Sequence, residues 1–274
     1  MKNLKYSLIV SDFDGTLVRS DGTISKETKE NIDAFIAAGG KFGLCTGRML
    51  ASILPRAKEL GLKGLVAAYQ GSVIADIESG EVVVDGGLSP EEAIEVCRLL
   101  EEDDLHIHVY SLDAFYSNKD DFALKYYERI TGVKGTVLSK KASEFVAEKG
   151  FSVKKVIALV ASEDRDRLYR KAQERFGDKY YVTYSSANLV EIASRTYSKG
   201  TAVRFMAKHY GVPIEKTIVV GDSLNDQPML EVAGKGIVVK NAEDVLKERF
   251  CSVDYTNDEN AVGQMIMTYA FDGE

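Results

Sequence analysis

The 274-residue sequence lacks an apolar run long enough to cross a membrane, and it lacks an excess of positive charge. A spanning helix needs about 20 consecutive apolar residues, and no stretch approaches that length. The formal net charge is −7, which argues against nucleic acid or an anionic membrane as a partner, because both require a basic face. A small anionic substrate remains compatible with this charge, since one divalent cation and one lysine can reverse the local field.

Cysteines are also few. Cys45, Cys97 and Cys251 are odd in number, far apart and set among apolar residues, which predicts reduced thiols in the core and a reducing compartment. The short apolar stretch near the start runs directly into Asp12 and Asp14, unlike a signal peptide. We therefore expect a cytoplasmic protein.

Both ends of the sequence alternate predicted strands and helices. Strands separated by helices imply right-handed crossovers and a parallel sheet. The strands are predicted at 6–10, 42–45, 65–68, 217–220 and 236–239.

The middle of the chain instead mixes short strands, hairpins and helices. One helix has a clear start at Ser89–Glu92 (SPEE), a capping box with proline at the first helical position. The predicted fold class is α/β, with a doubly wound (Rossmann-like) parallel-sheet core and an inserted α+β cap domain. The predicted core is discontinuous, 1–86 and 187–274, and the predicted cap is 87–186.

Two aspartates follow the first predicted strand, in the run Asp12–Leu17 (DFDGTL). Ligands of open α/β sheets bind beyond the carboxyl ends of the strands. Two carboxylates one residue apart on an extended segment, such as Asp12 and Asp14, point the same way. Alone, this pattern is more typical of a strand that ends in a plain polar turn.

Three more motifs at predicted strand or helix ends favour a site. Thr46–Arg48 (TGR) offers a hydroxyl and a backbone amide for an anion. Ser198–Gly200 (SKG) adds a cation at a helix start, and Gly221–Asp226 (GDSLND) adds a third acidic group. Four such motifs in an order that a doubly wound sheet can bring together are unlikely by chance.

With these motifs, the sequence resembles the haloacid dehalogenase-like hydrolases, specifically the Cof-type phosphatases with a large α/β cap. The resemblance covers residues 8 to about 242, although the cap matches in length and pattern rather than by motif. The four motifs are matched by Asp12–Leu17, Thr46, Lys199 and Gly221–Asp226.

The resemblance implies a role for each motif residue. Asp12 attacks phosphorus and becomes an aspartyl-phosphate, while Asp14 protonates the leaving oxygen and then activates water. Mg²⁺ is held by the Asp12 carboxylate, the Asp14 carbonyl and Asp222, with Asp226 acting mainly from behind these ligands; carboxylates and water are the ligands that magnesium prefers. The phosphoryl oxygens are bound by Thr46, Gly47, Lys199 and Asn225.

The resulting prediction is a Mg²⁺-dependent phosphomonoester hydrolase, a monomer or weak homodimer, whose partner is a small phosphorylated metabolite such as a sugar phosphate or phosphorylated cofactor. One alternative is a phosphotransferase or mutase-like relative that protects its phosphoenzyme from water. The other is a non-catalytic phosphometabolite sensor, since fold alone does not fix function. The presence of Asp12, Asp14 and Lys199 argues against a sensor.

Two features of the sequence leave substrate recognition open. Gln70–Ser72 (QGS) stands where many Cof-type proteins have Asn-Gly-Ala, and Asn260–Val262 (NAV) stands where Asp-Gly-Val is usual. His106 and His108 share one face of a predicted strand in the cap. That pair fits a plain strand face, a substrate contact, or a transition-metal site without an evident third ligand.

Overall fold

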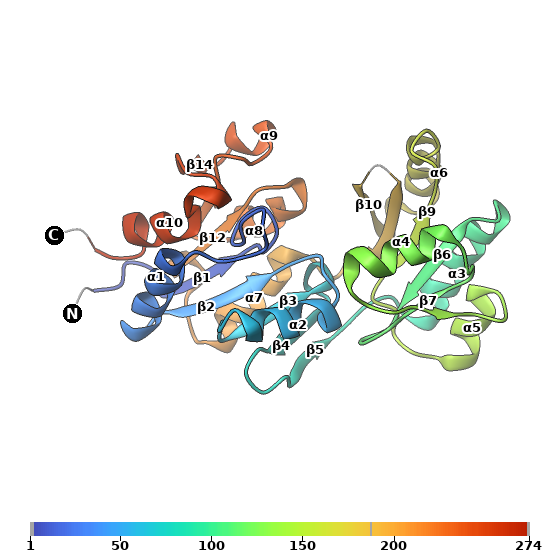
Figure 1. The fold of residues 1–274 in the computed structure, drawn as a ribbon, viewed down its shortest axis with the longest axis horizontal. Helices are drawn as coiled ribbons and strands as arrows, with labels where there is room; N and C mark the ends of the chain where they lie inside the picture. Colours follow the sequence, from blue (N-terminus) through green and yellow to red (C-terminus); the bar gives the residue numbers. More distant parts are fainter. Residues whose placement is uncertain (1–2, 187, 273–274) are drawn as a thin grey trace. The chain divides into compact units, whose positions relative to one another are not determined.

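The computed structural model describes residues 3–186 and 188–272, and the chain divides into two units (Figure 1). The core unit comprises Met1–Arg48, Leu54–Val84 and Tyr197–Glu274. The inserted unit comprises Met49–Ile53 and Asp85–Thr196. No helix among the described residues is both long and apolar enough to span a membrane.

The core unit is built on an eight-stranded sheet in the order β14-β13-β12-β1-β2-β3-β4-β5. The strands from β14 to β3 run parallel, and β4 turns back antiparallel to β3. Its central strand β1 (Leu8–Ser11) is buried along its whole length, as expected for a strand covered on both faces. The other strands are β2 (Lys41–Cys45), β3 (Leu65–Ala68), β4 (Val73–Asp76), β5 (Val82–Asp85), β12 (Thr217–Gly221), β13 (Lys235–Val238) and β14 (Cys251–Ser252).

Two helices of the core unit, α1 and α7, begin at a serine whose side chain caps them. The Ser25 hydroxyl accepts a hydrogen bond from the Thr28 amide at 3.0 Å and starts α1, a contact that stabilises a helix by about 1 kcal/mol. Ser198 starts α7 in the same way. The α-helices are α1 (Lys26–Ala37), α7 (Lys199–His209), α8 (Gln227–Val232), α9 (Asp244–Lys247), α10 (Ala261–Tyr269) and α2 (Leu50–Glu59), whose residues up to Ile53 are assigned to the inserted unit. The 3₁₀ turns are η1 (Tyr69–Gly71), η2 (Ile214–Lys216), η3 (Leu224–Asp226) and η4 (Asn257–Glu259).

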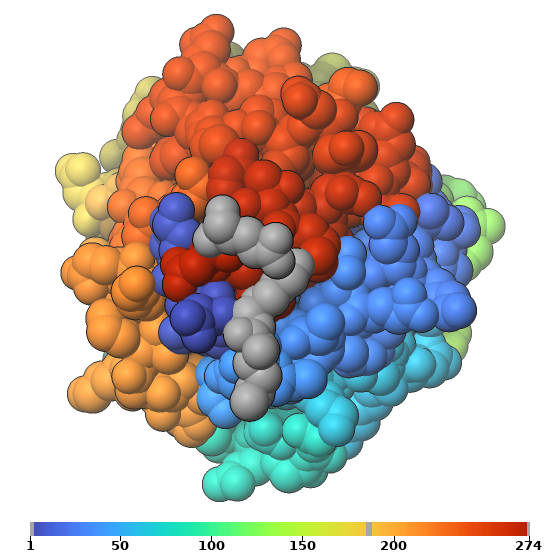
Figure 2. All heavy atoms as spheres, turned by 90° about the vertical axis from the view of Figure 1, so that its left-hand side faces the viewer, coloured from blue at the N-terminus to red at the C-terminus, as the bar shows by residue number. Residues whose placement is uncertain are grey.

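The two ends of the described chain meet on the core unit. Figure 2 shows the N-terminal segment in blue beside the C-terminal segment in red. The amide of Lys5 donates to the carbonyl of Ala270 at 2.9 Å, and Leu4 forms a bridge with Phe271. The two ends therefore stabilise each other.

The inserted unit has its own six-stranded sheet, in the order β10-β11-β9-β6-β7-β8. Its apolar core includes Ile107, Val109, Val156 and Ile192 from the sheet, with side chains from the helices α3, α5 and α6. The predicted capping box at Ser89 and Glu92 is present and starts α3. The elements are α3 (Pro90–Glu102), β6 (His106–Tyr110), β7 (Phe115–Ser117), α4 (Phe122–Thr131), β8 (Thr136–Val137), α5 (Ala142–Lys149), β9 (Val156–Leu159), α6 (Arg165–Phe176), β10 (Tyr180–Ser186) and β11 (Leu189–Ser194).

These features confirm the predicted fold class, an α/β core with an inserted α+β domain. The predicted domain limits (1–86 with 187–274, and 87–186) differ from the observed units chiefly at the second boundary. There, β11 pairs with β9 and β10 of the inserted sheet, so the inserted unit extends to Thr196.

The cysteines are unpaired, as predicted, but the expectation of three core thiols is wrong for Cys251. Cys45 and Cys97 are buried, whereas Cys251 lies exposed on the edge strand β14. Burial raises the pKa of the Cys45 thiol to about 12, so this thiol stays protonated at neutral pH and is not an activated nucleophile.

Candidate active site

Two neighbouring parallel strands bring the acidic motifs to one edge of the core sheet. In the register of β1 and β12, Ser11 lies opposite Val220, and the Asp12 amide donates to the Val220 carbonyl at 2.9 Å. Asp12 and the Gly221–Asp226 loop therefore leave the sheet side by side.

Lys199 joins these motifs through its ammonium group. Its Nζ donates to Asp12 Oδ1 and to Asp226 Oδ1, each at 2.5 Å. The exposed fractions of the three residues are 1% for Lys199, 5% for Asp12 and 0% for Asp226. Lys199 stands in the first turn of α7 because Ser198 caps that helix, so the helix start positions the cation.

Asp226 accepts three hydrogen bonds from protein donors. Its Oδ1 accepts from Lys199, and its Oδ2 accepts from the backbone amides of Asp222 (2.9 Å) and Ser223 (3.0 Å). A Cβ at Gly221 would lie 2.4 Å from the Asp226 carboxyl carbon, so only glycine fits there. Asp226 thus fixes the loop and the lysine together.

Asp222 contacts the Asp12–Leu17 motif through a hydrogen bond with Thr16. Its Oδ1 accepts from the Thr16 hydroxyl at 2.6 Å and its Oδ2 from the Ser223 hydroxyl at 2.8 Å. Gly15 has φ +74°, and a Cβ there would lie 2.8 Å from Asp222 Oδ2. This glycine is therefore required both by its left-handed backbone and by the close approach.

Asp12, Asp222 and Asp226 each offer a carboxylate oxygen within 4.8 Å of the others. Hard oxygen ligands of this kind suit a divalent cation such as Mg²⁺. Burial raises the pKa of Asp12 well above its usual value, and Lys199 opposes that shift only in part. Burial also raises the pKa of Asp222. Three carboxyl groups thus share one ammonium, and burial makes it costly for all three to be ionised without a further cation.

The charge of Lys199 itself is secure. Burial alone would lower the pKa of this lysine, but Asp12 and Asp226 together raise it above its usual range. The lysine is consequently a permanent cation in the cluster.

Asp14 forms a separate pair with a residue to which the sequence assigned no role. Its two carboxylate oxygens accept from Nε and Nη2 of Arg48, each at 2.7 Å, a bidentate geometry that favours strong pairing. The hydrogen bond with Asp14 raises the pKa of Arg48. The sequence did offer a clue to this pair, because Arg48 belongs to the same TGR motif as the predicted site residues Thr46 and Gly47.

Of the four predicted phosphate-binding residues, Lys199 is bonded to Asp12, and within the described residues the other three are not. Thr46 is buried, and its hydroxyl accepts from the Arg48 amide at 3.2 Å. Asn225 lies in η3, and its buried Oδ1 has no hydrogen-bond partner among the described residues. Within the described chain, no hydrogen bond links Thr46, Gly47 or Asn225 to Asp12, so their predicted role stays a prediction.

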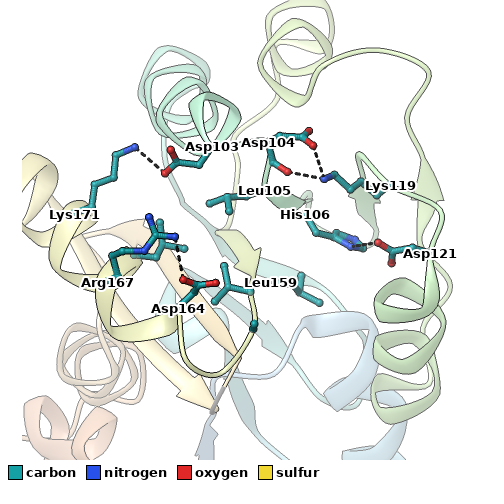
Figure 3. A pocket seen from close by; sticks show the side chains of 13 residues that line it. Asp103, Asp104, Leu105, His106, Lys119, Asp121, Leu159, Asp164, Arg167 and Lys171 are labelled. Carbon is teal, nitrogen blue, oxygen red and sulfur yellow. Dashed lines mark hydrogen bonds and ion pairs between the residues drawn. The ribbon is translucent and has the colours of Figure 1, made fainter.

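The inserted unit contains a pocket of about 270 Å³ whose ionic side chains pair with one another (Figure 3). All of its lining residues belong to the inserted unit, whereas the four motifs belong to the core unit. Its apolar lining includes Leu105, Leu159 and Leu168. The pairs are Asp103–Lys171 (2.9 Å), Asp104–Lys119 (3.2 Å), Asp164–Arg167 (3.0 Å) and Asp121–His106 (3.0 Å).

His106 and His108 both lie on β6, as predicted. Nε2 of His106 is 3.0 Å from Nε2 of His108 and 2.8 Å from the Ser117 hydroxyl. Burial lowers the pKa of His108 to about 3. Among the described residues, no cluster of three metal-ligating side chains includes this pair, so the transition-metal interpretation gains no support.

Comparison with known proteins defines the class. A family model described as haloacid dehalogenase-like hydrolase matches residues 9–266. The chain belongs to this family, and the predicted family and enzyme class, a phosphatase, are confirmed.

Among particular relatives, the chain is similar to two Bacillus subtilis proteins. Phosphatase YwpJ is 28% identical, with 94% of this chain and 98% of the relative covered. A 5-amino-6-(5-phospho-D-ribitylamino)uracil phosphatase, YwtE, is 30% identical, with 94% and 96% covered. A Thermotoga maritima crystal structure is 29% identical, with 97% and 98% covered and a TM-score of 0.85.

Proposed function

We propose that this phosphatase is a Mg²⁺-dependent phosphomonoester hydrolase that acts on a small phosphorylated metabolite through an aspartyl-phosphate at Asp12. The observation that carries the proposal is the cluster around Lys199, in which Asp12 and Asp226 are buried and Asp222 is partly buried. Such a cluster needs a further cation, and that cation and Lys199 together suit a phosphate dianion.

The donor set fits Mg²⁺. The proposed ligands are the Asp12 carboxylate, the Asp14 carbonyl and Asp222, with Asp226 behind them because its oxygens are already occupied by Lys199 and two amides. Mg²⁺ bound there would neutralise the excess carboxylate charge and draw charge from the phosphoryl oxygens.

The nucleophile is an oxygen of Asp12. Lys199 holds Oδ1, and this ion pair orients the carboxylate for attack by its other oxygen. A bond forms from Asp12 to phosphorus as the ester bond breaks, and the leaving oxygen takes a proton from Asp14. A water molecule then gives a proton to Asp14, attacks the same phosphorus and releases phosphate from Asp12.

Arg48 bears on the role of Asp14 as acid and base. Because Arg48 occupies both Asp14 oxygens, proton transfer requires at least one of these bonds to open.

The remaining proposed groups, Thr46, Gly47 and Asn225, bind the phosphoryl oxygens beside Lys199.

The ribityl phosphate named for the YwtE relative supports phosphorylated sugar- or cofactor-like metabolites as the substrate class. A mutase-like relative, the alternative within enzymes, would have to protect the phosphoenzyme from water. The acid/base Asp14 favours hydrolysis instead.

The test is release of inorganic phosphate from p-nitrophenyl phosphate by the full chain. We expect repeated turnover with MgCl₂, none in excess chelator, and poor replacement by calcium, which takes more ligands at longer distances. Turnover in excess chelator would refute the metal requirement. A single burst without turnover would indicate the mutase-like alternative, and no release at all would indicate a sensor.

A further inference from the structure

The turn after β3 has an unusual backbone. Tyr69 and Gln70 have φ values of 50° and 59°, and Gly71 follows at 101°. Non-glycine side chains rarely adopt this left-handed region, and two in succession cost conformational free energy. Strain of this kind persists where surrounding structure enforces it, commonly at functional sites.

The surrounding structure that enforces the turn consists of two predicted phosphate-binding motifs. The Tyr69 amide donates to the Arg48 carbonyl at 2.9 Å, and the Gln70 amide donates to the Thr46 carbonyl at 3.0 Å. A Cβ at Gly71 would lie 2.4 Å from the Ser198 carbonyl oxygen. The turn is therefore fixed against both the TGR loop and the start of the helix that carries Lys199.

The Gln70 side chain lies against the TGR loop. A Cβ at Gly47 would be 2.6 Å from Gln70 Nε2, so the carboxamide occupies the space beside that glycine. Its Oε1 is buried and has no hydrogen-bond partner among the described residues. Buried carbonyl oxygens are nearly always paired, so this oxygen calls for a donor.

We propose that Gln70 is a substrate-specificity residue whose Oε1 accepts a hydrogen bond from a hydroxyl or amino group on the alcohol part of the phosphate ester. A phosphate dianion has no proton to donate, so the donor must come from the leaving alcohol. The favoured substrates are therefore phosphomonoesters with a donor close to the ester oxygen, as in polyol phosphates. This inference rests on the proposed phosphatase site.

The experiment compares two esters that differ by one hydroxyl, 2-hydroxyethyl phosphate and ethyl phosphate. We expect the wild-type chain to prefer the hydroxylated ester in kcat/KM by about tenfold, the usual scale of one neutral hydrogen bond. Gln70→Met keeps similar bulk but cannot accept the bond, so the preference should fall to about one. If turnover of either ester is too slow, inhibition constants against p-nitrophenyl phosphate hydrolysis give the same ratio.

Gln70→Asn is the companion variant, because asparagine is tolerated in the left-handed region and its shorter amide withdraws the oxygen. It should also lose preference, with a melting temperature that shows an intact fold. A preference unchanged in both variants, or absent in the wild type, would overturn the inference. Equal slowing of both esters would overturn it too, because it would place Gln70 on the phosphoryl group. Absence of phosphate release from every ester would instead refute the proposed function.

Discussion

The two units of this protein handle buried and exposed charge in opposite ways. At the edge of the core sheet, Lys199 is shared by Asp12 and Asp226, and with Asp222 close by there is one ammonium for three carboxylates. In the pocket of the inserted unit, each of four carboxylates has its own basic or imidazole partner. The core cluster has one ammonium for three carboxylates, whereas every one of the four carboxylates in the pocket has a partner of its own.

The comparison shows why pocket size is a poor guide to chemistry here. The pocket residues Lys171 and Asp103 are 37% and 38% exposed, so water screens their pairing. Lys199 and Asp226 are 1% and 0% exposed, where charges interact strongly. Reactivity is expected where the charge is both buried and unbalanced.

The strongest test of this difference between the units is to neutralise one carboxylate in each of them and to compare the activities. Asp12→Asn is nearly isosteric but cannot attack phosphorus, so turnover should fall by more than about a hundredfold. Asp164→Asn in the pocket is the matched control and should stay within about twofold of wild type. Steady-state phosphate release measures both, and an active Asp12→Asn variant would remove the nucleophile assignment.

Removing one lysine from each unit tests the same contrast through stability. Lys199→Met leaves two buried carboxylates without their partner, so the free energy of unfolding should drop by about 3–5 kcal/mol. Lys171→Met breaks an exposed pair and should cost less than about 1 kcal/mol. Urea titrations without metal compare the two, and equal losses would contradict the assigned difference in burial.

Metal binding can be measured apart from activity. Mg²⁺ should raise the melting temperature of the wild type, and Asp222→Asn should weaken its apparent affinity at least about tenfold. Without metal, this variant should melt no lower than wild type, because burial raises the pKa of Asp222 and disfavours its charged form. Asp103→Asn is the control and should keep wild-type affinity; a similar loss there would place the metal elsewhere.

A further effect concerns pH and the buried imidazole of the inserted unit. Unfolded histidine gains a proton near 6.5, but burial keeps His108 neutral until about pH 3. Stability is therefore lost as pH falls below 6.5, by about 2 kcal/mol at pH 5. His108→Leu should flatten that decline in urea titrations at pH 7 and pH 5, with His209→Leu as the control for loss of one imidazole. An unchanged decline would contradict the burial of His108.

Much of the fold follows from local pattern. The strand Leu65–Ala68 has the predicted limits, the predicted strand with His106 and His108 is present, and the capping box at Ser89 starts its helix as predicted. Helix α5 (Ala142–Lys149) was not predicted, and its start has no side-chain cap that a sequence could reveal. The exposure of Cys251 likewise depends on an edge strand of only two residues.

The sequence motifs predicted which residues form the site, but not the side-chain contacts among them. Strand ends placed Asp12 and Asp222 together, because parallel strands β1 and β12 share one carboxyl edge. The partner of Asp14 is Arg48, a long side chain whose direction is decided by tertiary packing. The unpaired oxygen of Gln70 depends on a strained turn that no local propensity favours.

The central claim is that Asp12 becomes phosphorylated during turnover, and rapid mixing of Asp14→Asn with p-nitrophenyl phosphate tests it most directly. Nitrophenolate leaves without a proton, so the first step should proceed, while hydrolysis of the aspartyl-phosphate lacks its base and should slow by roughly 10²–10⁴. We predict a burst of p-nitrophenol that matches the enzyme concentration, and one added phosphoryl group on the peptide that contains Asp12. Slow release without a burst, or a phosphoryl group on another peptide, would contradict the account.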